Sequence, residues 1–195
     1  MKLFIDSSTF YLYLAVVDTN QTYYFTRYGK NDHSETLVDF LSAFLNAHQI
    51  SIQEIKEVYV GRGPGSYTGL RIAGTVGKVL ASIKDLPFYS FSSLDLLVSK
   101  YDNQEGKYLT RIVAKKNHSY IKAFTISNGQ IITDLSDSFV NDEELVKYQD
   151  YEMIEVNDDF FNNGDELANN LIKHQLFEKA DTLTYTPNYL RGEFQ

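Results

Sequence analysis

The stretch most able to do chemistry is the glycine-rich run at residues 61–71 (GRGPGSYTGLR). Gly63 and Gly65 permit backbone angles that other residues avoid, and Pro64 fixes its own φ between them. Ser66 is a suitable N-cap for a following helix, whose first amides would point at an anion. The spacing lacks the Lys of a phosphate loop, the third glycine of a dinucleotide fingerprint and the central Ser of a nucleophile elbow. A structural turn and an anion-binding turn therefore both stay open.

The helix predicted after this turn carries small residues at every fourth position: Gly69, Ala73, Gly77 and Ala81. Each helical glycine costs roughly 1 kcal/mol relative to alanine, which is tolerated where two backbones must approach closely. Apolar side chains flank this stripe: Leu70, Ile72, Val76, Val79 and Leu80. Packing within the chain and packing against a partner chain are both consistent with the pattern.

Thiol and metal chemistry find no support in the residue types. The chain has no cysteine, which excludes disulfides, thiolate zinc sites and cysteine nucleophiles. Its four histidines, His33, His48, His118 and His174, have no second histidine or paired acid at ligand spacing. We therefore predict no metal site, and we expect these histidines at the surface.

Charge and length limit the class of protein. The chain has 195 residues with 26 acidic and 18 basic side chains, giving a formal charge of −8. This length allows one domain or two small lobes, and the acidic balance argues against a free-standing nucleic-acid binder. Lys115, Lys116 and His118 form only a small basic spot, expected to be a solvated loop. Residues 134–166 hold twelve acids and one base; a solubilising surface and a docking face for a basic partner both stay open.

The sequence shows no targeting segment and no membrane span. The first residues (MKLFID) reach an acid at position six, and no run of about 20 apolar residues occurs. A cytoplasmic location is the default expectation.

Hydrophobic periodicity divides the first half into three strands followed by alternating helices and strands. We expect strands at 2–6, 10–17, 22–28, 57–60 and 88–91, and helices at 33–48, from 66 to about 83, and at 92–100. In the 33–48 helix, six apolar residues share an arc of roughly 160°: Leu37, Val38, Phe40, Leu41, Phe44 and Leu45. So wide an arc predicts contact with both a sheet and another helix.

The second half partly repeats this order. Strands are expected at 108–114, 119–127 and 130–135, and helical or strand-like pieces near 142–148, 152–156 and 166–176. Two runs of three strands, each followed by helices, predict a duplicated α/β unit. We place an N-terminal lobe at residues 1–100 and a smaller, acidic C-terminal lobe at 101–195.

Residues 61–81 (GRGPGSYTGLRIAGTVGKVLA) closely resemble the hallmark segment of the TsaB family, also called YeaZ. Other segments agree with this resemblance: 5–8 (IDSS), 14–16 (LAV), 33–34 (HS), Pro87, 92–94 (SSL) and 187–191 (PNYLR). The resemblance covers most of residues 1–100 and the C-terminal tail. It implies an actin-like (ASKHA) fold, in which two RNase H-like lobes of βββαβα order follow one another.

The resemblance also implies a function. TsaB is the dimerisation subunit of the bacterial machinery that makes threonylcarbamoyladenosine beside the anticodon of tRNAs. We therefore expect a non-catalytic scaffold that pairs with TsaD, is joined by the ATPase TsaE, meets tRNA only through the complex, and forms a homodimer when alone. The HxxxH metal pair of TsaD is missing here, because Leu37 stands four positions after His33.

The implied partner interface is the helix pair of the first lobe. Its expected contact residues are Leu37, Leu41, Phe44, Leu45, Gly69, Ala73, Val76 and Gly77.

The resemblance further places a phosphate loop at Asp6, Ser7 and Ser8, where actin-like ATPases hold phosphate and magnesium. The expected glycines are missing and Phe10 and Tyr11 crowd the turn, which favours a vestigial loop. We expect no cofactor for the chain alone.

Two alternatives to this scaffold interpretation remain. The first is an ATP or ADP site shared with TsaD, to which Ser66, Thr68 and Arg71 would contribute. The second is an enzyme of the same fold, either an ATPase or kinase or a metal-dependent glycopeptidase-like protein. Residues 113–117 (VAKKN) also depart from the Asp-Ala-Arg-like stretch usual in the family.

Overall fold

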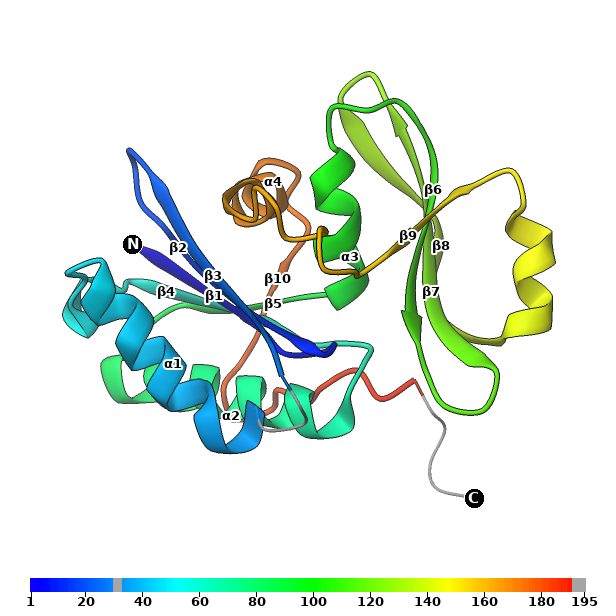
Figure 1. Cartoon of the computed structure of the whole chain (residues 1–195). Helices are drawn as coiled ribbons and strands as arrows, with labels where there is room; N and C mark the ends of the chain where they lie inside the picture. The colour runs from blue at the N-terminus through cyan, green and yellow to red at the C-terminus, as the bar shows by residue number, and fades with distance from the viewer. Residues whose placement is uncertain (30–32, 191–195) are drawn as a thin grey trace.

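The computed structural model describes residues 1–29 and 33–190, with side chains in the first helix described from residue 36 onward. It contains a six-stranded and a four-stranded sheet, with two helices between them and two on the outer face of the larger sheet (Figure 1). The side chains of His33 and Ser34, and the whole of Arg191, lie outside the described part. Within the described part, no helix is long and apolar enough to cross a membrane.

The first half follows the predicted order of three strands and then alternating helices and strands. Its elements are β1 (Lys2–Asp6), β2 (Tyr11–Val17), β3 (Thr22–Tyr28), α1 (His33–Ala47), the 3₁₀ turn η1 (Ile52–Glu54), β4 (Glu57–Gly61), α2 (Tyr67–Lys84), β5 (Phe88–Phe91), α3 (Ser93–Val98) and the 3₁₀ turn η2 (Ser99–Tyr101). These strands, with β4 and β5 parallel to β1, give the larger sheet the order β10-β5-β4-β1-β2-β3.

Strands of the larger sheet are apolar on both faces because helices cover both. In β1, Leu3 and Ile5 face the core under α1 and α2, whereas Phe4 faces the core between the two sheets. Phe4 stacks there on Tyr59 of β4 with ring centroids 4.5 Å apart. Such two-sided burial explains why these strands read as continuous apolar runs rather than alternating ones.

The second half repeats the strand order in a smaller sheet. Its elements are β6 (Gly106–Val113), β7 (His118–Ser127), β8 (Gln130–Asn141), the 3₁₀ segment η3 (Asp142–Tyr148), β9 (Glu152–Glu155), α4 (Asp165–Lys173) and β10 (Glu178–Lys179). The sheet order β8-β7-β6-β9, with β9 parallel to β6, matches β3-β2-β1-β4 of the first sheet. The predicted duplicated α/β architecture is therefore confirmed.

The predicted boundary between the lobes needs correction at the C-terminal end. β10 pairs antiparallel with β5 of the first sheet, with Glu178 opposite Ser90. The hydroxyl of Tyr13 on β2 donates to the carbonyl of Gly164, just before α4, at 2.7 Å. The second sheet is thus confined to residues 106–155, and the chain then returns to the first lobe. β10, from far along the chain, thus covers the edge of the first sheet that β5 would otherwise leave unpaired.

Candidate functional site

α1 and α2 lie side by side on one face of the first sheet (Figure 1). Ser66 caps α2 by accepting a hydrogen bond from the Gly69 amide at 3.3 Å, as the sequence predicted. α2 ends where Asp85 takes a left-handed conformation with φ of 50° and donates its amide to the Ala81 carbonyl. Pro87 then prevents the helix from continuing.

The inner faces of these helices are filled by the chain's own core. On α1, Leu37, Leu41 and Phe44 are at most 5% exposed and pack over the sheet. On α2, a Cβ atom added at Gly77 would lie 2.3 Å from Val60 Cγ2 of β4. Glycine at this position therefore lets the helix approach the sheet closely, which is the intramolecular interpretation of the small-residue stripe.

The predicted contact residues lie on this inner side. Leu37, Leu41, Phe44, Leu45, Gly69, Ala73 and Gly77 are all buried within the chain, and Val76 is half-buried. The prediction that a partner contacts these seven buried residues directly needs correction, because the chain itself covers nearly all of their surface. The sheet and the two helices use this apolar area to form one core.

The exposed apolar side chains of the helix pair are different ones. Val38 of α1 is 61% exposed, and Val79 and Ile83 of α2 are 49% and 79% exposed. We call these three residues the outer helix face. Most of the exposed positions around them are small: Asp39, Ser42, Ala43, Asn46, Thr75 and Ser82. Sequence reasoning did not assign the outer helix face to the site, although Val38 stands at the edge of the predicted arc and Val79 beside the stripe.

The glycine-rich turn packs against the turn between β1 and β2. The Ser66 amide donates to the Ser8 carbonyl at 2.6 Å, and the Ser7 hydroxyl donates to the Gly69 carbonyl at 2.8 Å. A Cβ atom at Gly69 would lie only 1.8 Å from the Ser7 carbonyl oxygen. The glycines therefore allow two backbones to meet, which is the structural interpretation of this turn.

Asp6 is buried in an internal network at the end of β1. One carboxylate oxygen accepts from the Ser8 amide at 2.9 Å and the Ser8 hydroxyl at 2.6 Å, and the other accepts from the Ser93 hydroxyl at 2.6 Å. Asp6, Ser7 and Ser8 are at most 3% exposed. Ser7 and Ser8 thus bond inward, and Asp6 joins β1 to the start of α3.

Ser66 is the N-cap of α2, and Thr68 and Arg71 follow within the first five residues of the helix; all three are exposed. The Ser66 hydroxyl oxygen already serves as the helix cap, and Arg71 donates to the Tyr67 hydroxyl at 2.9 Å. The Arg71 guanidinium also lies 5.1 Å from the Tyr67 ring centroid. A nucleotide site shared with a partner at these three residues stays a prediction.

The described histidines have aromatic or acidic neighbours. Among the described residues, no group of three or more His, Asp or Glu is placed to hold a metal ion. His48 is exposed and contacts the rings of Tyr23 and Phe44, with centroids 4.5 and 5.2 Å away. His118, the first residue of β7, directly follows the altered residues 113–117 and is half-buried, as is His174.

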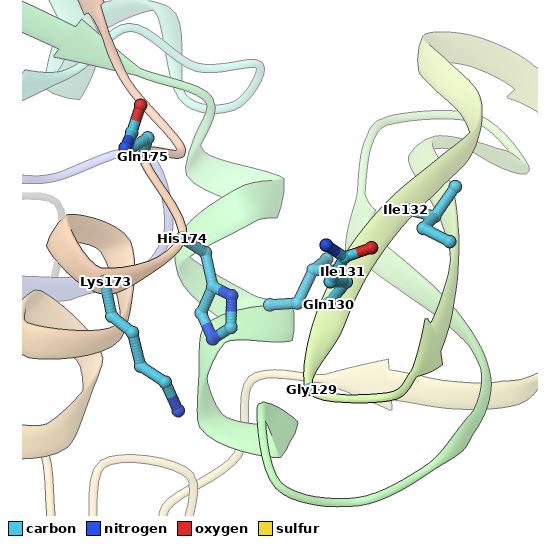
Figure 2. A pocket seen from close by; sticks show the side chains of 7 residues that line it. All are labelled: Gly129, Gln130, Ile131, Ile132, Lys173, His174 and Gln175. Carbon is cyan, nitrogen blue, oxygen red and sulfur yellow. The ribbon is translucent and has the colours of Figure 1, made fainter.

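A cavity of about 460 Å³ opens between the lobes on the side of the first sheet opposite α1 and α2 (Figure 2). Its lining residues are Gly129, Gln130, Ile131, Ile132, Lys173, His174 and Gln175. The buried Asp102 carboxylate accepts from Lys173 Nζ at 2.6 Å and lies 3.3 Å from His174 Nε2. The Asp102 carboxylate is therefore already paired with two side chains of the cavity lining. The cavity is separate from the helix pair.

A polar cluster joins the lobes on the other side of the molecule. Lys122 of β7 lies 2.6 Å from Asp95 of α3 and 3.6 Å from Asp137 of β8, and these three side chains are 10–13% exposed. Burial raises the pKa of the Asp95 carboxyl to about 6, opposed by the nearby Lys122 ammonium. One acid of the 134–166 segment thus faces inward. No periodicity in the sequence could have found the cluster, because its members come from three separate elements.

Three comparisons with known proteins agree on the family. The family model described as "TsaD: tRNA N6-adenosine threonylcarbamoyltransferase" matches residues 14–185. The TsaB protein of Bacillus subtilis is 31% identical over 153 residues, which cover 76% of this chain and 66% of that protein. The TsaB protein of Buchnera aphidicola from Acyrthosiphon pisum is 22% identical over 98% of both chains. Among solved structures, YeaZ from Pseudomonas aeruginosa superposes with a TM-score of 0.77 at 19% identity, covering 97% of this chain and 99% of that one.

The fold and the match across most of the chain define the class: this chain belongs to the TsaD family. Within that family, several of the relatives that it resembles are TsaB or YeaZ proteins, which confirms the resemblance identified from residues 61–81.

Proposed function

We propose that this chain is a non-catalytic subunit that pairs through α1 and α2 with a TsaD protein, joined by the ATPase TsaE, in making threonylcarbamoyladenosine in tRNA. It acts in the cytoplasm, associates with a second copy of itself when TsaD is absent, and meets tRNA only through the assembled complex. The TsaB relatives, each named for threonylcarbamoyladenosine biosynthesis, support this assignment.

The observation that carries the docking part is the outer helix face. Val38, Val79 and Ile83 stay exposed although the inner sides of both helices are packed against the sheet. Three exposed aliphatic side chains on adjacent helices, among mostly small neighbours, suit a helix face on another chain. The partner therefore contacts these residues, while the buried residues named earlier hold the two helices in place.

The site of the predicted phosphate loop supports a scaffold rather than an enzyme. Asp6 accepts hydrogen bonds from Ser8 and Ser93, and the Ser7 hydroxyl donates to Gly69. An ATPase needs these groups to face phosphate and a metal-bound water instead. We therefore propose that the chain binds no nucleotide alone, and that ATP or ADP is held only with TsaD, near Ser66, Thr68 and Arg71.

The test is an exposed substitution with a matched control in the second lobe. Ile83→Asp places a charge on the outer helix face, and Val146→Asp does the same at a 67% exposed position on η3. Because both side chains are exposed, each variant should keep its free energy of unfolding within about 0.5 kcal/mol. Ile83→Asp alone should lower self-association, measured by light scattering, and the affinity for TsaD by roughly tenfold or more.

Three results would contradict the proposal. Equal loss of TsaD binding in both variants would place the interface elsewhere. Threonylcarbamoyl transfer by TsaD and TsaE at the same rate with and without the chain would remove the scaffold role. Tight calorimetric binding of ATP and magnesium by the chain alone would favour the enzyme alternative.

A further inference from the structure

The C-terminal tail, residues 180–190, runs from β10 along α2 and holds to the first lobe by main-chain bonds (Figure 1). The Ala180 amide donates to the Phe88 carbonyl at 2.9 Å, and the Asn188 amide donates to the Arg62 carbonyl at 2.7 Å. The tail is therefore fixed at both of its ends, at β5 and at the glycine-rich turn.

Between these ends the tail packs against α2. The Tyr185 ring meets the Phe88 ring edge-on at 5.2 Å, and a Cβ atom at Gly74 of α2 would lie 2.9 Å from Tyr185 Cε1. Further along, the Tyr189 ring lies 5.0 Å from the ring of Tyr67 on the first turn of α2. The tail thus braces one flank of the helix that carries Val79 and Ile83.

The tail also bonds to the second lobe, through one side chain. Asn188 Nδ2 donates to Asp137 Oδ2 of β8 at 3.0 Å. The other carboxylate oxygen of Asp137 accepts from the Ser92 hydroxyl at 2.8 Å and lies 3.6 Å from Lys122 Nζ. Asp137 therefore meets the tail, the start of α3 and β7 at one point between the lobes.

This contact is stronger than an exposed amide–carboxylate bond. The Asp137 and Lys122 side chains are only 10% and 13% exposed, and Lys122 is shared with Asp95. A hydrogen bond to a buried charged acceptor contributes more than one between neutral groups, and leaving that acceptor without a partner is costly. We call Asp137, Asn188 and Lys122 the interlobe clasp.

We propose that Asp137 is a positioning residue for the docking surface: through Asn188 it fixes the tail, and the tail fixes the flank of α2 that a partner approaches. This inference rests on the proposed function for the identity of the partner. The clasp itself depends only on the geometry of the single chain. The clasp gives the second lobe a role in docking, although no residue of the outer helix face belongs to that lobe.

Exchanging the Asn188 and Asp137 side chains of the clasp tests the first half of the proposal, that Asp137 fixes the tail. Asn188→Asp sets two carboxylates against each other, whereas combining it with Asp137→Asn lets amide and carboxylate change places. We expect amide hydrogen exchange at Ala180 and Tyr185 to become roughly tenfold faster or more in Asn188→Asp. The combined variant should return to within about threefold of the unaltered chain. Asp134→Asn, an exposed acid on the same strand, is the matched control and should leave tail exchange unchanged.

Affinity for TsaD, measured on the same variants, tests the second half. Loss of the braced conformation should weaken binding by roughly tenfold in Asn188→Asp, with recovery in the combined variant. Unchanged tail exchange in Asn188→Asp would overturn the clasp. Faster exchange with unchanged affinity would overturn the positioning role and leave the proposed function standing. An unaltered chain that does not bind TsaD would instead overturn the proposed function, while hydrogen exchange still reports on the clasp.

Discussion

The two sheets share one strand order but differ in what covers them. In the first sheet, α1 and α2 cover one face and α4 packs against the other, while α3 packs between α4 and the inner face of the second sheet. In the second sheet, η3 covers the outer face over a small cluster built on Leu109, Ile121 and Ala123. The segment between β3 and β4 is long enough for a full helix, whereas residues 142–151 between β8 and β9 form only a 3₁₀ segment.

This difference shows how a duplicated fold can divide its work. In the first lobe, the inner sides of α1 and α2 complete the core, and their outer sides stay exposed. We propose that a partner binds to these outer sides. The second lobe is thinner and acidic, and Asp137 and Lys122 take part in the contacts that join it to the first. The same strand order thus carries the proposed docking surface in one lobe and the side chains that join the lobes in the other.

The largest effect should come from closing the backbone contact in the first lobe. In Gly69→Val, the new Cβ atom would meet the Ser7 carbonyl oxygen at 1.8 Å, and backbone cannot move aside cheaply. We expect a loss of roughly 4 kcal/mol or more in the free energy of unfolding, which outweighs the gain of at most about 0.5 kcal/mol from replacing a helical glycine by valine. Urea denaturation measures this net change in the free energy of unfolding.

Gly129 of the second lobe is the control, since a Cβ atom there has no neighbour within 4 Å and only its φ of +69° resists substitution. Gly129→Ala should therefore cost about 1 kcal/mol. Equal losses at the two glycines would mean that the turn at residues 61–71 is not tightly packed.

Truncating one leucine in each lobe should have a smaller effect on the free energy of unfolding, and the loss should differ between the two cores. Leu41→Ala removes a side chain that is 5% exposed beneath α1, and Leu145→Ala removes a half-buried one beneath η3. We expect losses of about 3 kcal/mol and about 1 kcal/mol, because the cost follows the cavity that is left behind. Denaturant midpoints at constant slope measure both, and a reversed order would refute the comparison of a thick and a thin core.

The smallest effect concerns the contact between the lobes and depends on pH. Burial raises the pKa of Asp95 to about 6, so the folded chain binds this proton more tightly than the unfolded chain. Stability from this group is therefore highest below the usual pKa range of aspartate and is lost as the pH rises through about 6. The charged groups facing Asp95 are Lys122, Asp137 and Arg62.

Asp95→Asn removes this dependence. Relative to the variant, the unaltered chain should lose about 2 kcal/mol of unfolding free energy between about pH 4 and pH 7. Urea denaturation at several pH values measures the difference. Parallel curves for the two proteins would show that the Lys122 ion pair fully offsets the burial of Asp95.

Much of the fold could be predicted from local pattern. The three strands at the start, the wide apolar arc of α1, the Ser66 cap and the stop near Pro87 all lie where periodicity and capping rules place them. The predicted and observed elements agree closely because these features depend on residues that are near one another in the chain, within one helix or between adjacent strands.

The candidate site was predicted less well. The sequence predicted both helices of the pair, but it assigned to a partner the residues that the chain buries itself, such as Leu41 and Gly77. An apolar arc shows that a helix is covered, and it does not show by what. It also could not show that Ile83, at the end of α2, stays exposed.

The amino-acid sequence by itself determined the elements, the duplicated order and the family to which the chain belongs. Only the tertiary structure decided which apolar residues remain outside, that β10 returns to the first sheet, and that Asp137 meets Asn188 between the lobes. Patterns of period two and 3.6 report on one element at a time, whereas burial and ion pairing depend on residues brought together from distant parts of the chain.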